Sequence, residues 1–159
     1  MEHLGELYAK YPKIFVQMKE GFFAISSGVP DAWIQTLDWM CGAIQAHIDN
    51  RNEHNPHLPP IMQVVCDQVK DKYGGLRFYF HGGNETHESI KGYKWYLRPI
   101  VRLHRKYVSK YEFRDSAIDG MVDMAEYILW ETCERCGSHD NLTTTQGWIR
   151  RVCDKCKEK

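Results

Sequence analysis

Residues 61–81 read IMQVVCDQVKDKYGGLRFYFH and carry the clearest fold signal in the chain. Its first part, 61–69, is rich in β-branched residues. In its second part three apolar residues alternate with more polar ones, as Leu76-Arg77-Phe78-Tyr79-Phe80-His81. The linking sequence Lys72-Tyr73-Gly74-Gly75 supplies residues that tolerate a positive φ. The stretch therefore predicts a β-hairpin whose second strand has one apolar face.

A two-stranded hairpin is marginally stable by itself, so its apolar face needs a helix layer to cover it. Upstream, apolar residues recur at three- and four-residue spacing, which predicts an amphipathic helix of roughly five turns. These residues are Trp33, Leu37, Met40, Ile44 and Ile48. Asp31 is the expected N-cap of this helix. A shorter helix that begins near Leu4 is expected to end before Pro12.

Two more helices are predicted downstream of the hairpin. Pro99 suits the first turn of a helix that runs to about Lys110. Ser116 and Asp119 resemble a capping box, and the amphipathic pattern behind them ends near Cys133. Together the elements predict an α+β domain over residues 1–131, in which helices pack on a small antiparallel sheet.

Four cysteines near the C-terminal end form two C-x2-C pairs separated by sixteen residues. The pairs are Cys133 with Cys136 and Cys153 with Cys156. This spacing is typical of a four-thiolate zinc site, in which each tight turn presents two thiolates to one ion. Residues 142–145 and 148–152 predict a short hairpin that brings the second pair to the first. Residues 132–159 are therefore expected to form a zinc ribbon with one structural Zn²⁺.

The cysteine pattern has alternatives. Two disulfides or four free thiols are disfavoured because the first residues show no export signal. A catalytic zinc is disfavoured because four cysteines leave no open coordination position. His139 is an alternative ligand for one position. Cys41 and Cys66 stand apart among apolar residues and are expected to be small buried hydrophobic side chains.

The composition excludes several classes of protein. Apolar residues make up 43% of the 159 residues and charged residues 26%, which excludes wholesale disorder. The sequence has no run of roughly 18 or more apolar residues, so no membrane span is expected. With no secretory signal pattern, the expected location is the cytoplasm. The formal net charge is zero, which argues against a surface coated in positive potential.

The neutral total conceals a basic, aromatic segment at residues 91–114. It holds eight basic residues and one acid, Glu112, and therefore carries a charge of +7. Cations beside aromatic rings bind phosphates and stacked bases, so the segment is a candidate site for a nucleic acid or a nucleotide signal. The candidate ligand-binding residues are Arg77, Lys94, Trp95, Arg98, Arg102 and Arg105. The alternative is that the tyrosines belong to the core and the basic residues to a solvated helix face.

No motif commits the chain to catalysis. Asp119, Asp123 and Glu126 recur at i, i+4 and i+7 on the last predicted helix. They suit cation binding or acid–base chemistry, but a solvated helix face is the expected role. Three histidines that are close in sequence are expected to be polar loop residues: His47, His54 and His57. The sequence has no phosphate-binding loop, nucleophile elbow or protease-type zinc motif.

Several segments resemble a family of small uncharacterised phage and prophage proteins. They are Tyr11-Pro12-Lys13-Ile14-Phe15, Ile44-Gln45-Ala46-His47-Ile48, Val69–Tyr79, Met124-Ala125-Glu126, Cys133-Glu134-Arg135-Cys136-Gly137, Gly147-Trp148 and Cys153. The most specific feature is the K-x-K-Y-G-G-L-R-F-Y motif together with the cysteine-pair tail. The resemblance implies a viral or mobile-element origin and the zinc tail. Related sequences connect the hairpin to the last helix by a shorter segment, so residues 84–114 resemble an insertion, and residues 18–30 lack the family's cysteine- and tryptophan-rich pattern.

Three functions remain open at this point. The first is a non-enzymatic phage accessory protein that binds and inhibits a host factor, above all a defence component, in the host cytoplasm. The second is a protein that binds nucleic acid or a nucleotide signal through residues 91–114. The third is a nuclease or hydrolase that uses the carboxylates between Asp119 and Glu126. A host protein is the expected partner under the first hypothesis, and self-association is open under all three.

Overall fold

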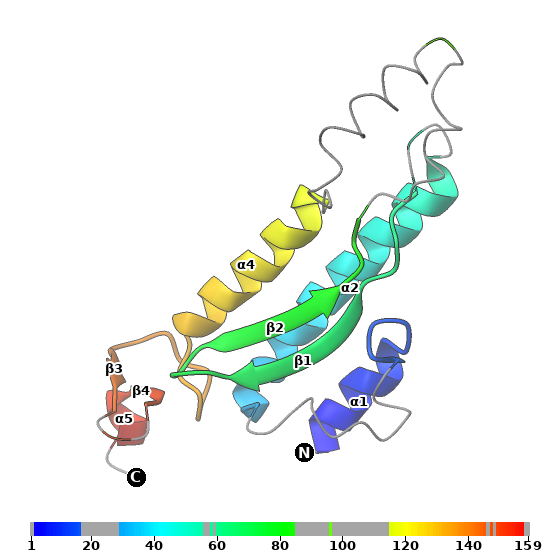
Figure 1. Ribbon diagram of the computed structural model, residues 1–159. Coiled ribbons are helices and arrows are strands. Elements are labelled where there is room, and N and C mark those ends of the chain that lie inside the picture. Colours follow the sequence, from blue (N-terminus) through cyan, green and yellow to red (C-terminus); the bar gives the residue numbers. More distant parts are fainter. Residues whose placement is uncertain are drawn as a thin grey trace.

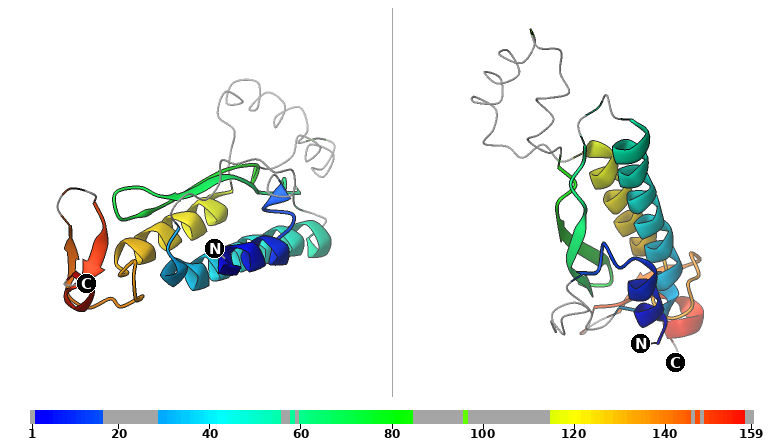
Figure 2. Two further views of the ribbon diagram at one scale, coloured as in Figure 1. Left: turned by 90° about the horizontal axis from the view of Figure 1, so that it is seen from below. Right: turned by 90° about the vertical axis from the view of Figure 1, so that its right-hand side faces the viewer.

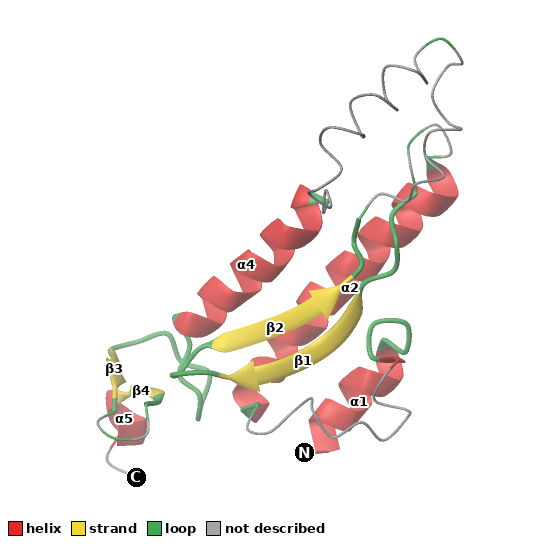
Figure 3. Cartoon of the chain, viewed as in Figure 1, coloured by secondary structure: helices red, strands yellow, loops and turns green. Residues whose placement is uncertain are grey.

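The computed structural model describes residues 2–16, 29–55, 58, 60–84, 96, 115–145, 147 and 149–157. Its elements are α1 (Glu2–Lys10), η2 (Asp31–Trp33), α2 (Ile34–Asp49), η3 (Asn50–His54), β1 (Val65–Asp71), β2 (Leu76–His81), α4 (Ser116–Trp130), β3 (Leu142–Thr144), β4 (Arg151–Cys153) and α5 (Asp154–Lys157). The β1–β2 hairpin lies over one side of α2 and α4, with α1 beside α2 (Figures 1 and 2). The small β3–β4 hairpin lies beyond the end of α4 (Figure 3). The fold is α+β, as predicted, with a cysteine-rich C-terminal ribbon.

The β1–β2 hairpin confirms the central sequence prediction. Its strands are antiparallel, with Val69 opposite Phe78 and Asp71 opposite Leu76. β1 begins at Val65 rather than at Ile61, and a bulge interrupts its register between Cys66 and Gln68. In the turn, Tyr73 and Gly74 both have a positive φ, of 59° and 81°. The motif that decides the fold is therefore a tight turn between two core-forming strands.

One hydrophobic cluster joins the hairpin to the helices. Its members from β2 are Leu76, Phe78 and Phe80, and those from α2 include Trp33 at its entrance, Leu37, Ile44 and Ile48. Ile118, Val122, Ala125 and Leu129 of α4 and Leu4 and Leu7 of α1 complete the layer. The apolar periodicity thus identified the buried faces of both long helices. Among the described residues, no helix is long and apolar enough to span a membrane.

The helix starts differ from the sequence predictions. Asp31 does not cap α2, because the chain enters that helix through the 3-10 turn Asp31–Trp33 and no side chain caps it. α4 is capped by Asp115, one residue before the predicted capping box, and Asp115 Oδ1 accepts a hydrogen bond of 2.8 Å from Ala117 N–H. Asp115 N–H also donates to Gly83 O, which ties the start of α4 to the end of the hairpin. The helix predicted from Pro99 lies outside the described residues.

Candidate metal centre

The four cysteines of the two C-x2-C pairs come together in space. The Sγ atoms of Cys133, Cys136, Cys153 and Cys156 all lie within 4.8 Å of one another. Cys136 Sγ lies 3.6 Å from Cys153 Sγ. Four sulfurs placed about 2.3 Å from a tetrahedral Zn²⁺ are about 3.8 Å apart, whereas a disulfide brings two sulfurs to about 2.05 Å. The cluster therefore has the dimensions of a metal site, and all four cysteines are free thiols.

Local backbone structure places the two cysteine pairs. After Cys133 the chain turns back, with Gly137 N–H donating to Cys133 O at 2.9 Å and Gly137 at a φ of 75°. Cys153 ends β4, and Cys156 lies in the short α5 that follows. Pairing of β3 with β4 sets Leu142 opposite Cys153, which returns the second pair to the first. The predicted ribbon hairpin is present, although its strands cover only three residues each.

The thiols in the cluster differ in acidity. Burial raises the pKa of the Cys133 thiol, but hydrogen bonds from the backbone N–H groups of Cys153, Cys136 and Arg135 outweigh burial and bring it to about 6. The Cys153 N–H lies 3.3 Å from Cys133 Sγ. A hydrogen bond with Cys136 raises the pKa of the Cys156 thiol to about 12. Neighbouring thiols therefore oppose ionisation of all four cysteines, and a cation held by them would supply the charge that stabilises four thiolates together.

His139 does not join the cysteine cluster. Among the described residues, the side chains brought close enough to hold a metal are the four cysteines. His139 Nδ1 instead lies 2.6 Å from Glu131 O, at the end of α4. The histidine therefore satisfies a carbonyl group at a helix terminus, where the last turn leaves carbonyls without intrahelical partners.

The glycines of the hairpin turn lie directly against the ribbon. A Cβ atom at Gly74 would lie 2.9 Å from Arg151 N and 3.2 Å from the carbonyl carbon of Arg150. A Cβ at Gly75 would lie 2.8 Å from the Trp130 ring. Both distances are shorter than a side chain tolerates, so only glycine fits at these two positions. The K-Y-G-G motif is therefore also the surface on which the ribbon packs. It allows the hairpin backbone to approach β4 and the end of α4.

Arg151 makes a second link between the ribbon and the helix layer. Its Nε donates to Trp130 O at 2.9 Å, and its guanidinium lies 4.9 Å from the centre of the Trp130 ring. Its backbone N–H donates to the Glu134 carboxylate at 2.7 Å, while Glu134 N–H donates to Arg151 O. Glu134 is buried, and burial raises the pKa of its carboxyl. Arg151, Trp130 and Glu134 were not identified from the sequence as part of the site. Only their closeness in sequence to the cysteine ligands pointed to them.

The structure describes some of the predicted ligand-binding and acidic residues but not all of them. Arg77, the described member of the basic set, lies on β2 and pairs with Glu126 Oε2 of α4 at 2.9 Å. Glu126 Oε1 also accepts a hydrogen bond from Phe78 N–H. These contacts give Glu126 a structural role, clamping α4 to the hairpin, while Asp123 is exposed. The other members of the basic set, Lys94, Trp95, Arg98, Arg102 and Arg105, lie outside the described residues.

The structure also shows where the two isolated cysteines and two of the three histidines lie. Cys41 and Cys66 are fully buried in the main core, as predicted, and burial raises the pKa of Cys41 to about 12. His47 is not a loop residue: it lies in the last turn of α2, and its Nε2 is 3.2 Å from Asp115 Oδ2. His54 ends the π-helical turn η3, and His57 lies outside the described residues.

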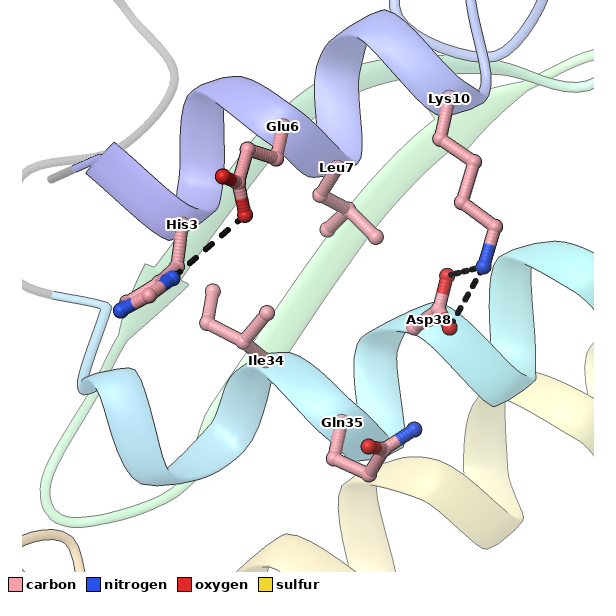
Figure 4. Close-up of a pocket in the computed structure, with 7 residues that line it drawn as sticks. All are labelled: His3, Glu6, Leu7, Lys10, Ile34, Gln35 and Asp38. Carbon is pink, nitrogen blue, oxygen red and sulfur yellow. Dashed lines mark hydrogen bonds and ion pairs between the residues drawn. The ribbon is translucent and has the colours of Figure 1, made fainter.

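A small cavity separates α1 from α2, and no sequence pattern predicted it. It encloses about 220 Å³. Leu7 and Ile34 face each other across it, and an ion pair of 2.7 Å between Lys10 and Asp38 closes one end (Figure 4). Because Lys10 and Asp38 already pair with each other, this end of the cavity offers no unpaired charge to a ligand. The cavity is therefore a gap in the packing between α1 and α2, and the cysteine cluster is the stronger candidate site.

Comparisons with family models, with curated proteins and with solved structures found no match for the chain. Four sulfur donors, two tight turns and a short two-stranded hairpin are the parts of a zinc ribbon, and they form a closed ligand set.

Proposed function

We propose that the chain is a non-enzymatic zinc-binding accessory protein of phage origin that binds and inhibits a host factor. The observation that carries the proposal is the closed set of four thiolates at the ribbon. Zinc suits four sulfur donors in a tetrahedron, and a site filled by four protein ligands leaves no position for a substrate or a reactive water. The metal then serves to hold the ribbon in place.

The contacts around the ribbon support a structural role for the ion. Cys153 ends the same strand that carries Arg151, and Arg151 binds the end of α4 and meets the hairpin turn. An ion that fixes Cys153 therefore also fixes the position of β4 against the main domain. Binding of zinc to structural sites contributes directly to folding free energy.

One of the three candidate catalytic carboxylates of α4, Glu126, has a structural role. Glu126 is held by both the Arg77 guanidinium and Phe78 N–H, so it stabilises the contact between helix and hairpin. If the chain were a nuclease or hydrolase that used this helix face, Asp119→Asn and Asp123→Asn would abolish its turnover. Under our proposal, the two substitutions leave host-factor inhibition unchanged.

Binding to a host factor is tested with the full, zinc-loaded chain. The immobilised protein is exposed to host lysate, and the enriched protein is purified and assayed with and without the chain. We expect one host protein to be enriched and its activity to fall as the chain is added. Failure to enrich any protein above a bare-matrix control, or enrichment without inhibition, would contradict the proposal.

A second candidate function rests on the +7 charge of residues 91–114. Binding of nucleic acid through this segment would weaken steeply as salt concentration rises, because phosphate contacts release counterions. A charge-reversed variant at Lys94, Arg98, Arg102 and Arg105 would then lose binding. If binding ignores salt or survives these substitutions, the segment does not bind nucleic acid.

A further inference from the structure

The four cysteines of the cluster differ in their access to solvent. Cys133 and Cys153 are buried, with 0% and 3% of their surface exposed. Cys156 is partly buried, whereas Cys136 is exposed. A small molecule dissolved in water therefore reaches Cys136 more readily than the buried pair. The four candidate ligands are consequently not equivalent toward a chemical reagent, because the susceptibility of a cysteine to oxidation follows its exposure.

The local fold explains why Cys136 is the exposed member. It lies in the turn that follows Cys133, where Gly137 N–H donates to Cys133 O at 2.9 Å. Cys133 and Cys153 instead pack with Val152, which is also buried, in the small hydrophobic cluster of the ribbon. The β3–β4 hairpin thus shields the first cysteine of one pair and the first of the other, while the turn presents Cys136 to solvent.

The exposed sulfur lies close to a buried one. Cys136 Sγ is 3.6 Å from Cys153 Sγ. A disulfide joins two sulfurs at about 2.05 Å, so these two must approach by about 1.6 Å to form a bond. They belong to different C-x2-C pairs, and Cys153 is the last residue of β4. A bond between them would connect the turn after Cys133 directly to the end of that strand.

We propose that the cluster is an oxidation site at which hydrogen peroxide attacks Cys136, a Cys136–Cys153 disulfide forms, and the ion is released. This inference rests on the zinc site proposed above. The Cys136 sulfur first takes an oxygen from the peroxide: the O–O bond breaks, a sulfenic acid forms and hydroxide leaves. The Cys153 sulfur then displaces a second hydroxide from Cys136, so that the S–O bond breaks and the S–S bond forms. Two thiolates lose two electrons, and one peroxide gains them.

This reaction removes half of the ligand set and so affects the contact between the ribbon and the main domain. Cys133 and Cys156 remain as thiolates, and two sulfur donors do not complete a tetrahedral site. Arg151 of β4 holds Trp130 O at 2.9 Å and packs against Gly74, so loss of the ion loosens β4 from α4 and from the hairpin turn. A thiol reductant together with zinc reverses the change, because thiols exchange with disulfides.

Stepwise addition of hydrogen peroxide to the zinc-loaded chain tests the proposal. Zinc content is measured first by elemental analysis, released zinc by a colorimetric chelator, and disulfides by peptide mass spectrometry after alkylation of free thiols. We expect one zinc to be released for each Cys136–Cys153 disulfide, and a dimedone adduct of the sulfenic acid at Cys136. Cys41 and Cys66 are internal controls: both are buried in the main core and should stay reduced.

Two matched variants test the role of the exposed sulfur. Cys136→His and Cys156→His each leave three thiolates and one imidazole, a ligand set that zinc accepts. Cys136→His should slow zinc release by roughly ten-fold, because it removes the exposed sulfur. Cys156→His retains Cys136 and Cys153 and should release zinc as fast as the wild type. If either variant fails to bind zinc, the disulfide map of the wild-type chain decides.

Three results would overturn the inference while leaving the zinc site intact. They are zinc that stays bound in excess peroxide, a first disulfide that does not join Cys136 to Cys153, and equal rates of zinc release from the two histidine variants. A chain purified without zinc would instead contradict the zinc site itself, and this inference with it.

Discussion

The main domain and the ribbon are stabilised by different kinds of interaction. Among the described residues, the main domain has one cluster of 21 buried apolar residues, drawn from α1, α2, the hairpin, α4 and the segments that connect them. In the part of the chain that the structure describes, the ribbon's own hydrophobic cluster has three buried members, Cys133, Val152 and Cys153, two of which are candidate metal ligands. Hydrophobic burial is therefore expected to suffice for the first region, whereas the second is expected to need bonds to a metal ion in order to fold. The predictions below separate these two sources of stability.

The largest effect is expected from loss of the metal site. Cys153→Ser removes one thiolate and should unfold residues 133–157 while α1, α2, the hairpin and α4 remain folded. Structural zinc contributes about 10–16 kcal/mol of apparent binding free energy in small zinc-finger peptides, far more than the ribbon core can replace. Two-dimensional NMR spectra and elemental analysis measure the two regions and the zinc content.

Cys41→Ala is the control for this substitution, because Cys41 is buried in the main core and lies outside the cluster. It should retain full zinc content. If Cys153→Ser leaves the ribbon signals unchanged, or if it unfolds the whole chain, the two regions are not stabilised as described.

A substitution in the main core should destabilise the main domain and leave zinc binding unchanged. Leu129→Ala creates a cavity in the main cluster, where Leu129 is fully buried, and should lower the free energy of unfolding by about 2–5 kcal/mol. Zinc content should stay at the wild-type value. Met62→Ala, at a side chain that is 49% exposed, should change stability by no more than about 0.5 kcal/mol in the same chemical denaturation experiment. Equal losses in the two variants would place Leu129 outside the core.

Gly74→Ala tests the contact between the regions. Gly74 has a φ of 81°, and an added Cβ would lie 2.9 Å from Arg151 N, so the turn and β4 must move apart. We expect a loss of about 1–3 kcal/mol, with the largest NMR shift changes at Arg150 and Arg151. Gly5→Ala, in an α-helix with no atom within 4 Å of the new Cβ, should be neutral or stabilising by up to about 1 kcal/mol. Unchanged shifts in β4 would show that the turn does not contact the ribbon.

The smallest effect concerns the cap of α4. Burial raises the pKa of the Asp115 carboxyl, but the hydrogen bond from Ala117 N–H and the contact with His47 outweigh it and hold the pKa below 3.8. The carboxylate therefore contributes stability above about pH 4, and this contribution disappears as the pH falls through its folded pKa. Asp115→Ala should cost about 1 kcal/mol at neutral pH, and Asp115→Asn less. A difference from the wild type that stays constant down to pH 2 would contradict this assignment.

Sequence reasoning reached most of the fold because the deciding signals are local. The apolar spacing from Trp33 to Ile48 and the alternation at Leu76, Phe78 and Phe80 each identify a buried face directly. The cysteine spacing likewise identified the cluster. Tertiary contacts carry no such local signal. The pairing of Arg77 with Glu126 joins residues 49 apart, and the packing of Gly74 on Arg151 joins the two regions.

The helix starts were mispredicted for a related reason. Asp31 and Ser116 are residue types that commonly cap helices, but the choice of cap depends on how the chain enters the helix. At α4 the entering chain is fixed by the Asp115 N–H bond to Gly83 O, which selects Asp115. Pattern alone could not identify this contact with the end of the hairpin.

Four thiolates are expected to close a structural zinc site at the ribbon. X-ray absorption spectroscopy at the zinc edge, on the purified chain with its zinc content measured, tests it most directly. We expect one zinc per chain with four sulfur neighbours at about 2.3 Å and no nitrogen or oxygen neighbour. Absence of zinc, or a spectrum that requires a histidine or a water molecule among the ligands, would contradict it.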